Sequence, residues 1–198
     1  CMDGSDDLIA FLQRALGYAV TGNVSEDALL FFYGAGCNGK STLLNVISQT
    51  LGPDYAHEAI PDLLLQKRRD HLTELADLHG RRLVTTTETG DGARFAEVLV
   101  KRLTGRDPIT ARRMREDPWQ FMPTFTLIVS GNHKPVIRGT DDAIWRRIHL
   151  VWFNVSFKGR EDKELPEIYR NIKPLHNNLD IQKHEVGGMF YFDLQDQS

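Results

Sequence analysis

The segment at 34–41, Gly-Ala-Gly-Cys-Asn-Gly-Lys-Ser, constrains the fold of this chain more than any other feature. It fits the pattern G-x-x-x-x-G-K-[ST], and it lies between an apolar run at 28–33 and a helical pattern at 42–51. Glycines there let the backbone turn its N–H groups inward around phosphate oxygens, and the helix N-terminus adds a positive dipole end. The sequence therefore predicts a strand, a phosphate-binding loop and a helix in succession.

This loop predicts that the chain binds ATP together with Mg²⁺. Lys40 should reach the β- and γ-phosphates, while the hydroxyl of Ser41 should be a ligand of Mg²⁺. Cys37 occupies a variable loop position, where we expect a small filler side chain and not a redox switch. The expected nucleotide-binding residues are Gly34, Ala35, Gly36, Cys37, Asn38, Gly39, Lys40, Ser41 and Thr42.

Short apolar or β-branched runs alternate with helical patterns as far as residue 157. Strands are expected at 28–33, 82–87, 125–129 and 148–153, and helices at 6–17, 42–51, 71–78 and 93–103. This alternation predicts an α/β fold with a central, mainly parallel sheet flanked by helices. We divide the chain into an N-terminal helix and linker at 1–22, a core at 23–157 and a C-terminal extension at 158–198.

The composition limits the class of protein. The 198 residues are 41% hydrophobic and 26% charged, a balance that argues against a disordered chain. No run approaches the ~18 apolar residues that span a bilayer, and no basic-then-apolar leader opens the chain, so we expect no membrane contact and a soluble, cytoplasmic protein. The opening Cys1-Met2 suggests a piece of a longer protein. The net charge of −3 gives no sign of a nucleic-acid partner, so we examine the charge of individual segments instead.

A catalytic carboxylate is expected at the end of a strand neighbouring the loop. The run at 82–87 ends in Glu88, which would help to hold Mg²⁺ and would orient or deprotonate the attacking water. Asp91 lies just beyond and could assist. The competing interpretation is an ordinary solvated glutamate at a strand end.

Several further motifs narrow the choice among nucleotide-hydrolysing proteins. After the loop and the Thr87-Glu88 strand end come KRLTGRDPITAR at 101–112, F-x-P-x-F at 121–125, a strand followed by Asn132, and Trp-Arg-Arg at 145–147. In this order they resemble the superfamily 3 helicase domain of phage and plasmid primase-helicase proteins, a group related to poxvirus primase-helicases. The resemblance covers about residues 7–157, whereas 158–198 do not follow the family pattern. Many members have two adjacent acidic residues where this chain has Thr87-Glu88.

The resemblance implies an AAA+-like P-loop core with an inserted β-hairpin, and it implies a role for each motif. Lys40, Glu88 and Asn132 would act on the γ-phosphate or the attacking water. Either Arg146 or Arg147 would be the arginine finger that reaches the ATP of an adjacent subunit, which implies a homo-oligomer, usually a hexameric ring. The resemblance also implies a primase domain in the full-length protein and a source in phage, prophage or virus replication machinery in a host cell.

The local charge agrees with a single-stranded DNA partner. Residues 81–115 contain nine basic and four acidic side chains, a net charge of +5 inside an acidic chain. A pore that contacts phosphates needs such a reversal, although any one of these arginines could belong to a merely solvated surface. Trp119 and Phe121 could stack on bases, but packing within the hairpin is the more ordinary role of such aromatic residues. The expected DNA-binding residues are Lys101, Arg106, Arg112, Arg113 and Arg115.

The leading hypothesis is an ATP-dependent replicative DNA helicase that hydrolyses ATP between subunits, translocates on single-stranded DNA and unwinds duplex. An AAA+-like ATPase that loads or remodels DNA complexes without unwinding is an alternative. A P-loop kinase of a small molecule would need an acceptor pocket and no partner arginine. A non-catalytic, nucleotide-gated DNA-binding module is the fourth candidate.

Overall fold

A five-stranded parallel sheet forms the centre of the computed structural model, in the strand order β2-β3-β6-β1-β7. The structure describes residues 2, 4–61, 63–65, 72–87, 94–134, 136–137 and 142–172, and the backbone of 180–186 and 189–195. The strands of the sheet are β1 (Leu29–Tyr33), β2 (Ala56–Glu58), β3 (Leu83–Thr87), β6 (Thr126–Gly131) and β7 (Ile148–Trp152). The expected α/β architecture with a mainly parallel sheet is confirmed.

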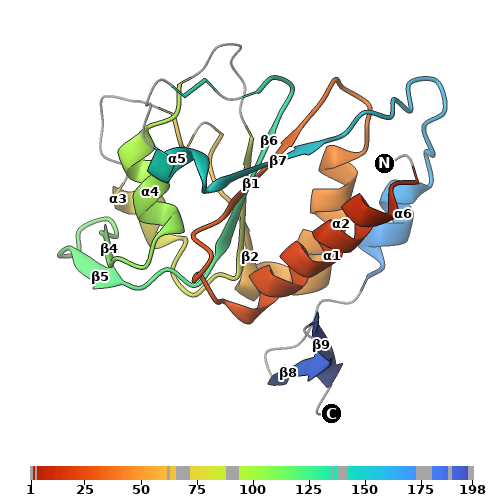
Figure 1. Cartoon of the computed structure of the whole chain (residues 1–198). Helices are drawn as coiled ribbons and strands as arrows, with labels where there is room; N and C mark the ends of the chain where they lie inside the picture. The colour runs from red at the N-terminus through yellow and green to blue at the C-terminus, as the bar shows by residue number, and fades with distance from the viewer. Residues whose placement is uncertain are drawn as a thin grey trace.

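Helices cover both faces of the sheet (Figure 1). On one side lie α1 and α2, with α6 beside α2, and on the other side lie α3, α4 and α5. The helices are α1 (Asp6–Thr21), α2 (Lys40–Tyr55), α3 (Leu72–Ala76), α4 (Glu97–Thr104), α5 (Asp142–Trp145) and α6 (Leu165–Arg170).

Strand residues alternate between two hydrophobic cores, because successive side chains of a strand point to opposite faces. In β1, Leu29 and Phe31 pack with the α3–α4–α5 layer, while Leu30 and Phe32 pack with α1 and α2. Both faces are therefore buried, as expected for parallel strands that read as continuous apolar runs. Helix α1 contributes Leu12 and Ala19 to the second core.

The register aligns the strand ends at two opposite edges of the sheet. At the end that we call the carboxyl edge, Tyr33 of β1 lies opposite Gly131 of β6, and Ser130 lies opposite Thr87 of β3. At the other end, the amino edge, β1 begins at Leu29 opposite Ile148 of β7. Any side chains that follow β1, β3 and β6 therefore start from one edge.

Some element boundaries differ from the expected ones. Helix α1 does not end at Gly17 but continues to Thr21, because the left-handed C-cap is Gly22 (φ 71°), whose N–H bonds to the carbonyl of Ala19. Gly52 (φ 74°) interrupts α2 near the expected stop, but a further helical turn follows before β2. Helix α4 begins at Glu97, and the expected start at 93 lies outside the described residues.

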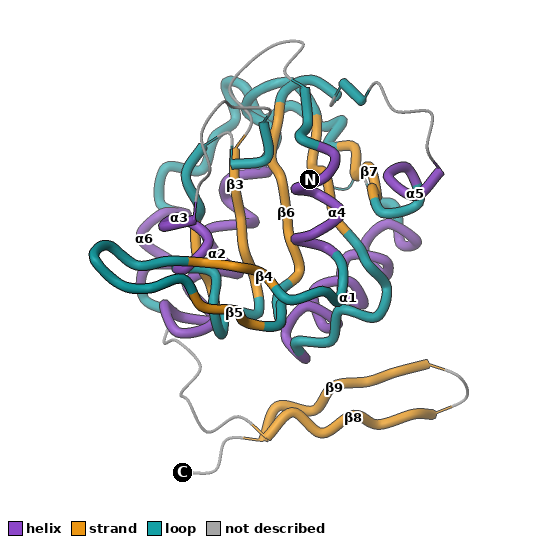
Figure 2. The backbone as a smooth tube through the Cα atoms, turned by 90° about the vertical axis from the view of Figure 1, so that its left-hand side faces the viewer, coloured by secondary structure: helices purple, strands orange, loops and turns teal. Residues whose placement is uncertain are grey.

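A second, two-stranded sheet lies at the same end of the molecule as the amino edge. β4 (Ile109–Ala111) and β5 (Trp119–Phe121) pair antiparallel directly before β6, forming the hairpin at the lower left of the main body in Figure 2. In the tail, β8 (Asp180–Val186) pairs antiparallel with β9 (Met189–Gln195). Among the described residues, no helix is long and apolar enough to cross a membrane.

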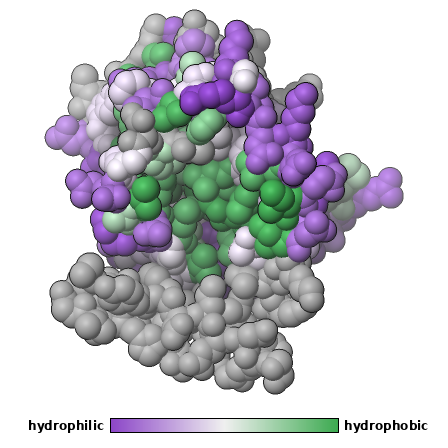
Figure 3. All heavy atoms as spheres, turned by 90° about the vertical axis from the view of Figure 1, so that its right-hand side faces the viewer, coloured by the Kyte–Doolittle hydropathy of each residue, from purple (hydrophilic) through white to green (hydrophobic). Residues whose placement is uncertain are grey.

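The helical layer that carries α1 and α2 has apolar side chains at its surface, bordered by hydrophilic ones (Figure 3). Leu8, Phe11, Leu16 and Ile47 are partly buried residues of this layer, and Ile9 is exposed. This layer therefore buries apolar side chains against the sheet and also exposes some of them on its outer surface.

Candidate functional site

The loop at 34–41 joins the end of β1 to the start of α2 at the carboxyl edge. Its backbone takes conformations with positive φ at Gly34 (147°), Cys37 (56°) and Gly39 (86°). A Cβ on Gly34 would lie 2.3 Å from the carbonyl oxygen of Phe153, so this position can hold only glycine in the present fold. The sequence GAGCNGKS therefore forms the tight turn that its glycines predict.

The start of α2 is open to an anion. Gly39 is the N-cap residue, and no side chain of the described chain caps the first turn. The first four N–H groups of a helix have no partner within the helix, and together with the dipole they favour negative charge. An acceptor group in front of Lys40, Ser41 and Thr42 would satisfy these donors.

Lys40 is a buried cation, with 5% of its surface exposed. Its ammonium donates hydrogen bonds to the carbonyl of Gly34 at 2.7 Å and to Oδ1 of Asn38 at 3.0 Å. Burial lowers the pKa of Lys40 below its ordinary value of 10.5, because desolvation penalises the charged form. Since these are the two acceptors that the described residues offer, the buried ammonium would gain from a phosphate nearby.

The segment after β7 holds the loop from outside. The amide of Asn38 donates to the carbonyl of Phe153 at 3.1 Å, and the N–H of Phe157 donates to the carbonyl of Cys37 at 2.6 Å. Because Asn38 also accepts from Lys40, it ties the position of the ammonium to the neighbouring strand. This support joins residues 115 positions apart, and the sequence analysis did not predict it.

A cavity of about 340 Å³ opens between the loop and the ends of β3 and β6. Three sequence regions line it, namely 36–42 of the loop and helix, Thr87 of β3, and 130–132 at the end of β6. Asn132 thus lines the same cavity as Lys40 and Ser41. Glu88 directly follows Thr87 but, like Asp91, lies outside the described residues.

A second cavity of about 500 Å³ adjoins the first, because Ser41, Thr87 and Ser130 line both. It runs along α2 and β2, where His57 and Glu58 face it, and Tyr169 and Arg170 of α6 line it as well. Burial is the main cause that lowers the pKa of His57, and the positive charge of Arg81 adds to it. The sequence analysis missed this cavity, because β2 is a short Ala-His-Glu strand without an apolar pattern.

Arg146 and Arg147 lie at the amino edge, away from the loop. The carbonyl of Arg147 accepts from the N–H of Leu29 where β1 begins, and its guanidinium donates to Oδ2 of Asp27 at 3.1 Å. Arg147 is buried, whereas the side chain of Arg146 is 67% exposed and lies 4.0 Å from the same carboxylate. One arginine is therefore fixed in the fold, and the other is presented to solvent.

The basic residues expected to contact DNA fall into two groups. Arg112, Arg113 and Arg115 are exposed around the tip of the β4–β5 hairpin, with Arg115 at φ 64°. Arg106 lies instead beside Asp27, with Nε 3.8 Å from Oδ1, and Lys101 is half-buried on α4.

The two aromatic residues of the hairpin pack against each other and against His79. Trp119 and Phe121 lie 5.3 Å apart, and each makes an edge contact with His79, at 4.9 and 5.2 Å. Phe121 is buried, so the packing interpretation of these aromatics holds.

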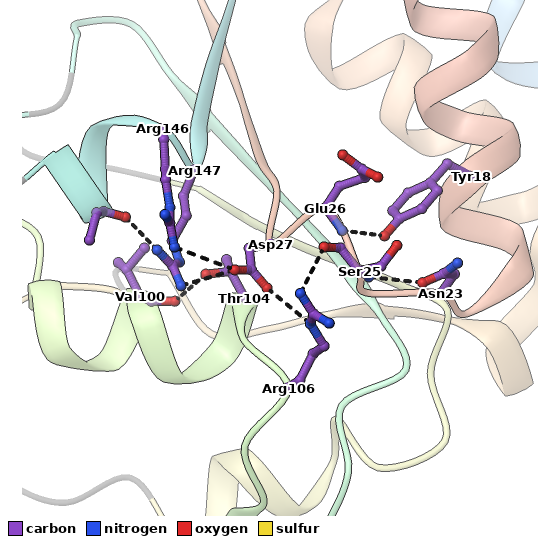
Figure 4. A network of polar contacts seen from close by, with 11 residues as sticks. Tyr18, Asn23, Ser25, Glu26, Asp27, Val100, Thr104, Arg106, Arg146 and Arg147 are labelled. Carbon is purple, nitrogen blue, oxygen red and sulfur yellow. Dashed lines mark hydrogen bonds and ion pairs between the residues drawn. The ribbon is translucent and has the colours of Figure 1, made fainter.

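Asp27 is the functional candidate that the sequence analysis did not consider. It precedes β1, has a positive φ of 51° and lies near three arginines (Figure 4). A signal was present, since a carboxylate next to a buried strand needs a cation. The sequence alone does not say which of 24 basic residues that cation is.

Comparison with known proteins gives one family match. A family model described as a family of unknown function, DUF5906, matches residues 32–147. The match contains the whole loop at 34–41 and ends at the second of the two arginines.

Viral proteins are among the similar sequences. A protein named putative helicase L207/L206 of Acanthamoeba polyphaga mimivirus is 33% identical over 150 residues, which is 74% of this chain and 16% of that protein. The protein named primase D5 of fowlpox virus is 28% identical over 162 residues, 79% of this chain and 20% of that one. The chain thus spans a fifth or less of these relatives.

A solved structure shares the fold. The apo structure of the NrS-1 C-terminal region superposes with a TM-score of 0.62 at 17% identity, covering 86% of this chain and 41% of that one. At this identity the likeness supports the fold alone.

Proposed function

The chain belongs to the DUF5906 family, and from that premise we propose that it is the ATPase domain of a superfamily 3-type DNA helicase in a viral replication protein. Relatives named helicase and primase support a replication role. The size of those relatives supports further domains, a primase domain among them, in the longer protein.

One observation carries the proposal. The predicted Lys40 loop, the predicted Asn132 and the residue before the predicted Glu88 surround one cavity at the carboxyl edge. They come from three strands that are far apart in the sequence, and the order β3-β6-β1 makes these strands neighbours. Ligands of open α/β sheets bind beyond the carboxyl ends of the strands, which is where this cavity lies.

The chemistry at this edge suits in-line attack of water on a γ-phosphate. Lys40 and the N–H groups at the start of α2 would hold the phosphate oxygens and stabilise the charge that develops. The hydroxyls of Ser41, Thr87 and Ser130 are hard oxygen donors of the kind that suit Mg²⁺, which would neutralise phosphate charge when bound. Glu88 would accept the proton of the water, and Asn132 would orient that water or the γ-phosphate.

Arg146 is the better candidate for the arginine finger, because it is exposed and Arg147 is fixed by Asp27. It cannot serve its own nucleotide site, since the two edges are separated by the length of β1, which for five residues is about 13 Å at ~3.3 Å per step. A finger at the amino edge must therefore act on a second copy of the chain. This geometry favours a ring of subunits with a shared ATP site.

The hairpin is the proposed contact with single-stranded DNA. Three exposed arginines around its tip would bind backbone phosphates, and the packed base would keep the tip in place. We expect no sequence preference from such contacts, because guanidinium–phosphate pairs carry no base information.

The decisive experiment measures ATP hydrolysis against protein concentration, with and without single-stranded DNA. Specific activity that rises with concentration, and rises again with DNA, is expected of composite sites between subunits. Activity that stays constant in both series would contradict the proposal. DNA-stimulated hydrolysis without strand displacement in the longer protein would indicate a loading or remodelling ATPase.

The site itself is tested by Lys40→Met, which keeps the aliphatic chain but removes the charge. We expect hydrolysis to fall by about 10²–10³-fold, the usual cost of losing one group that stabilises a transition state. The matched control is Lys163→Met, since Lys163 is exposed and distant in the sequence from the loop at 34–41, from Asn132 and from the hairpin. Unchanged turnover in Lys40→Met would show that the loop is not the catalytic site.

The larger cavity favours a second candidate, a P-loop kinase of a small molecule. At about 500 Å³, and adjoining the cavity proposed for phosphate, it offers space for an acceptor. A kinase would work as a single chain, so its turnover would be independent of protein concentration and of DNA. Arg146 would then be dispensable.

A further inference from the structure

Asp27 joins the two parts of the amino edge to which separate roles have been assigned. Its side chain, 18% exposed, lies between Arg147 at 3.1 Å, Arg106 at 3.8 Å and Arg146 at 4.0 Å. Figure 4 shows the guanidinium groups of all three turned toward this carboxylate. The three arginines come from the α4–β4 connection and from the turn between α5 and β7.

The three contacts are not equivalent. Only Arg147 is within hydrogen-bond distance of the carboxylate, and its second anchor is the carbonyl of Ala143. Arg106 and Arg146 keep about two-thirds of their side chains exposed. The ion pair with Arg147 therefore belongs to the fold, while the other two arginines lie mostly in solvent and are held to Asp27 by charge.

The excess of positive charge makes the arrangement of this cluster sensitive to a nearby anion. Three guanidinium groups share one carboxylate, so the cluster has a net charge of +2 and the arginines repel one another. Nε of Arg147 is buried and makes no hydrogen bond to any described group. Arg146 and Arg147 lie at Oδ2 of Asp27, whereas Arg106 lies at Oδ1. Withdrawing Arg146 toward an anion would remove one repelling cation from the cluster, and Asp27 would then hold Arg106 more strongly.

The position of Arg106 gives this competition a consequence. Arg106 lies three positions before Ile109, the first residue of β4, and it also donates to the carbonyl of Ser25 at 3.4 Å. A change in its contacts would shift the root of the hairpin that bears the basic tip. Asp27 and Arg106 thus lie between Arg146 and the root of the hairpin.

We propose that Asp27 is a positioning residue that couples the phosphate sensed by Arg146 in a neighbouring subunit to the DNA-binding hairpin of its own subunit. This inference rests on the proposed function. Coupling free energies between sites commonly correspond to about 5–150-fold changes, so we expect Asp27→Asn to reduce stimulation of hydrolysis by DNA about tenfold. The affinity for nucleotide, measured without DNA, should change less than twofold, because the carboxyl edge is untouched.

A double-mutant cycle in the 198-residue chain tests the coupling itself. Asp27→Asn, Arg106→Gln and their combination are compared by the DNA-stimulated turnover number, with unstimulated turnover and melting temperature as references. If Asp27 acts through Arg106, the double variant is no worse than the poorer single variant. If the two losses multiply, the residues act independently and the coupling is refuted.

A second cycle covers the case in which Asp27→Asn fails to fold because Arg147 loses its partner. Arg106→Gln and Arg146→Gln leave that buried pair intact, and non-additive losses of DNA stimulation are again expected, whereas multiplying losses refute the coupling. If the turnover of the parent chain depends neither on DNA nor on protein concentration, the proposed function itself is refuted. A DNA-stimulated parent with additive variants refutes only the role of Asp27.

Discussion

The two edges of the central sheet carry different kinds of chemical group. At the carboxyl edge, backbone conformation and buried hydrogen bonds place one lysine, and the surrounding groups are glycines, hydroxyls and amides. At the amino edge, charged side chains dominate, with Asp27 among three arginines and more arginines around the hairpin tip. The first edge is a cavity whose lysine is held by buried hydrogen bonds, and we propose it as the phosphate site, whereas the second carries exposed cations held by few contacts.

The largest effect is expected where the amino edge would act on another subunit. Arg146→Ala should lower ATP hydrolysis about 10³-fold, the low end of what an arginine finger contributes, and should leave nucleotide binding intact. Because the side chain is 67% exposed, its loss should change the free energy of unfolding by less than about 0.5 kcal/mol. Turnover and chemical denaturation of the same sample measure both quantities.

Arg147→Ala is the matched comparison and should behave in the opposite way. It removes the buried partner of Asp27, and breaking such a pair costs about 3 kcal/mol of folding stability. Its effect on hydrolysis should follow from the lost folded fraction. If Arg147→Ala folds normally and Arg146→Ala hydrolyses ATP like the parent, the assignment of the two arginines is reversed.

The next effect concerns the backbone of the carboxyl edge. Gly34→Ala forces a Cβ to within 2.3 Å of the Phe153 carbonyl and 2.7 Å of the Asn38 amide, at φ 147°. We expect a loss of about 3 kcal/mol in stability and loss of nucleotide binding. Gly36→Ala is the control, since a Cβ there meets nothing within 4 Å. Equal melting temperatures for the two variants would show that the loop is not rigid.

The sequence predicted the carboxyl edge far better than the amino edge, and the reason is locality. Gly34 to Thr42 form one contiguous pattern, and parallel strands bring Asn132 to the same end without further information. Asp27 and Arg147, by contrast, are 120 positions apart, and only tertiary packing pairs them. The end of α1 was misjudged at Gly17 because a glycine in the interior of a packed helix costs only about 1 kcal/mol.

A smaller effect is expected at the hairpin tip. Arg113→Gln should weaken binding of single-stranded DNA and reduce the slope of log affinity against log salt concentration by about 0.7, the share of one phosphate contact. Lys163→Gln, an exposed lysine outside the hairpin, should leave the slope unchanged. Fluorescence anisotropy at several salt concentrations measures both slopes. A slope unaffected by Arg113→Gln would remove this residue from the DNA interface.

The smallest expected effect lies between the edges, at His57. Burial and the positive charge of Arg81 lower its pKa below 6.5, while Asp77 and Glu58 act in the opposite sense. The unfolded chain then binds more protons than the native one just below pH 6.5, so stability falls as the pH drops from 6.5 to the folded pKa. His57→Gln should flatten this part of the stability profile, as measured by denaturant midpoints between pH 7.5 and 5. Asp77→Asn should steepen it, because it removes a charge that favours protonation of His57. An opposite sign for His57→Gln would contradict the lowered pKa of His57, and an opposite sign for Asp77→Asn would contradict the effect of the Asp77 charge.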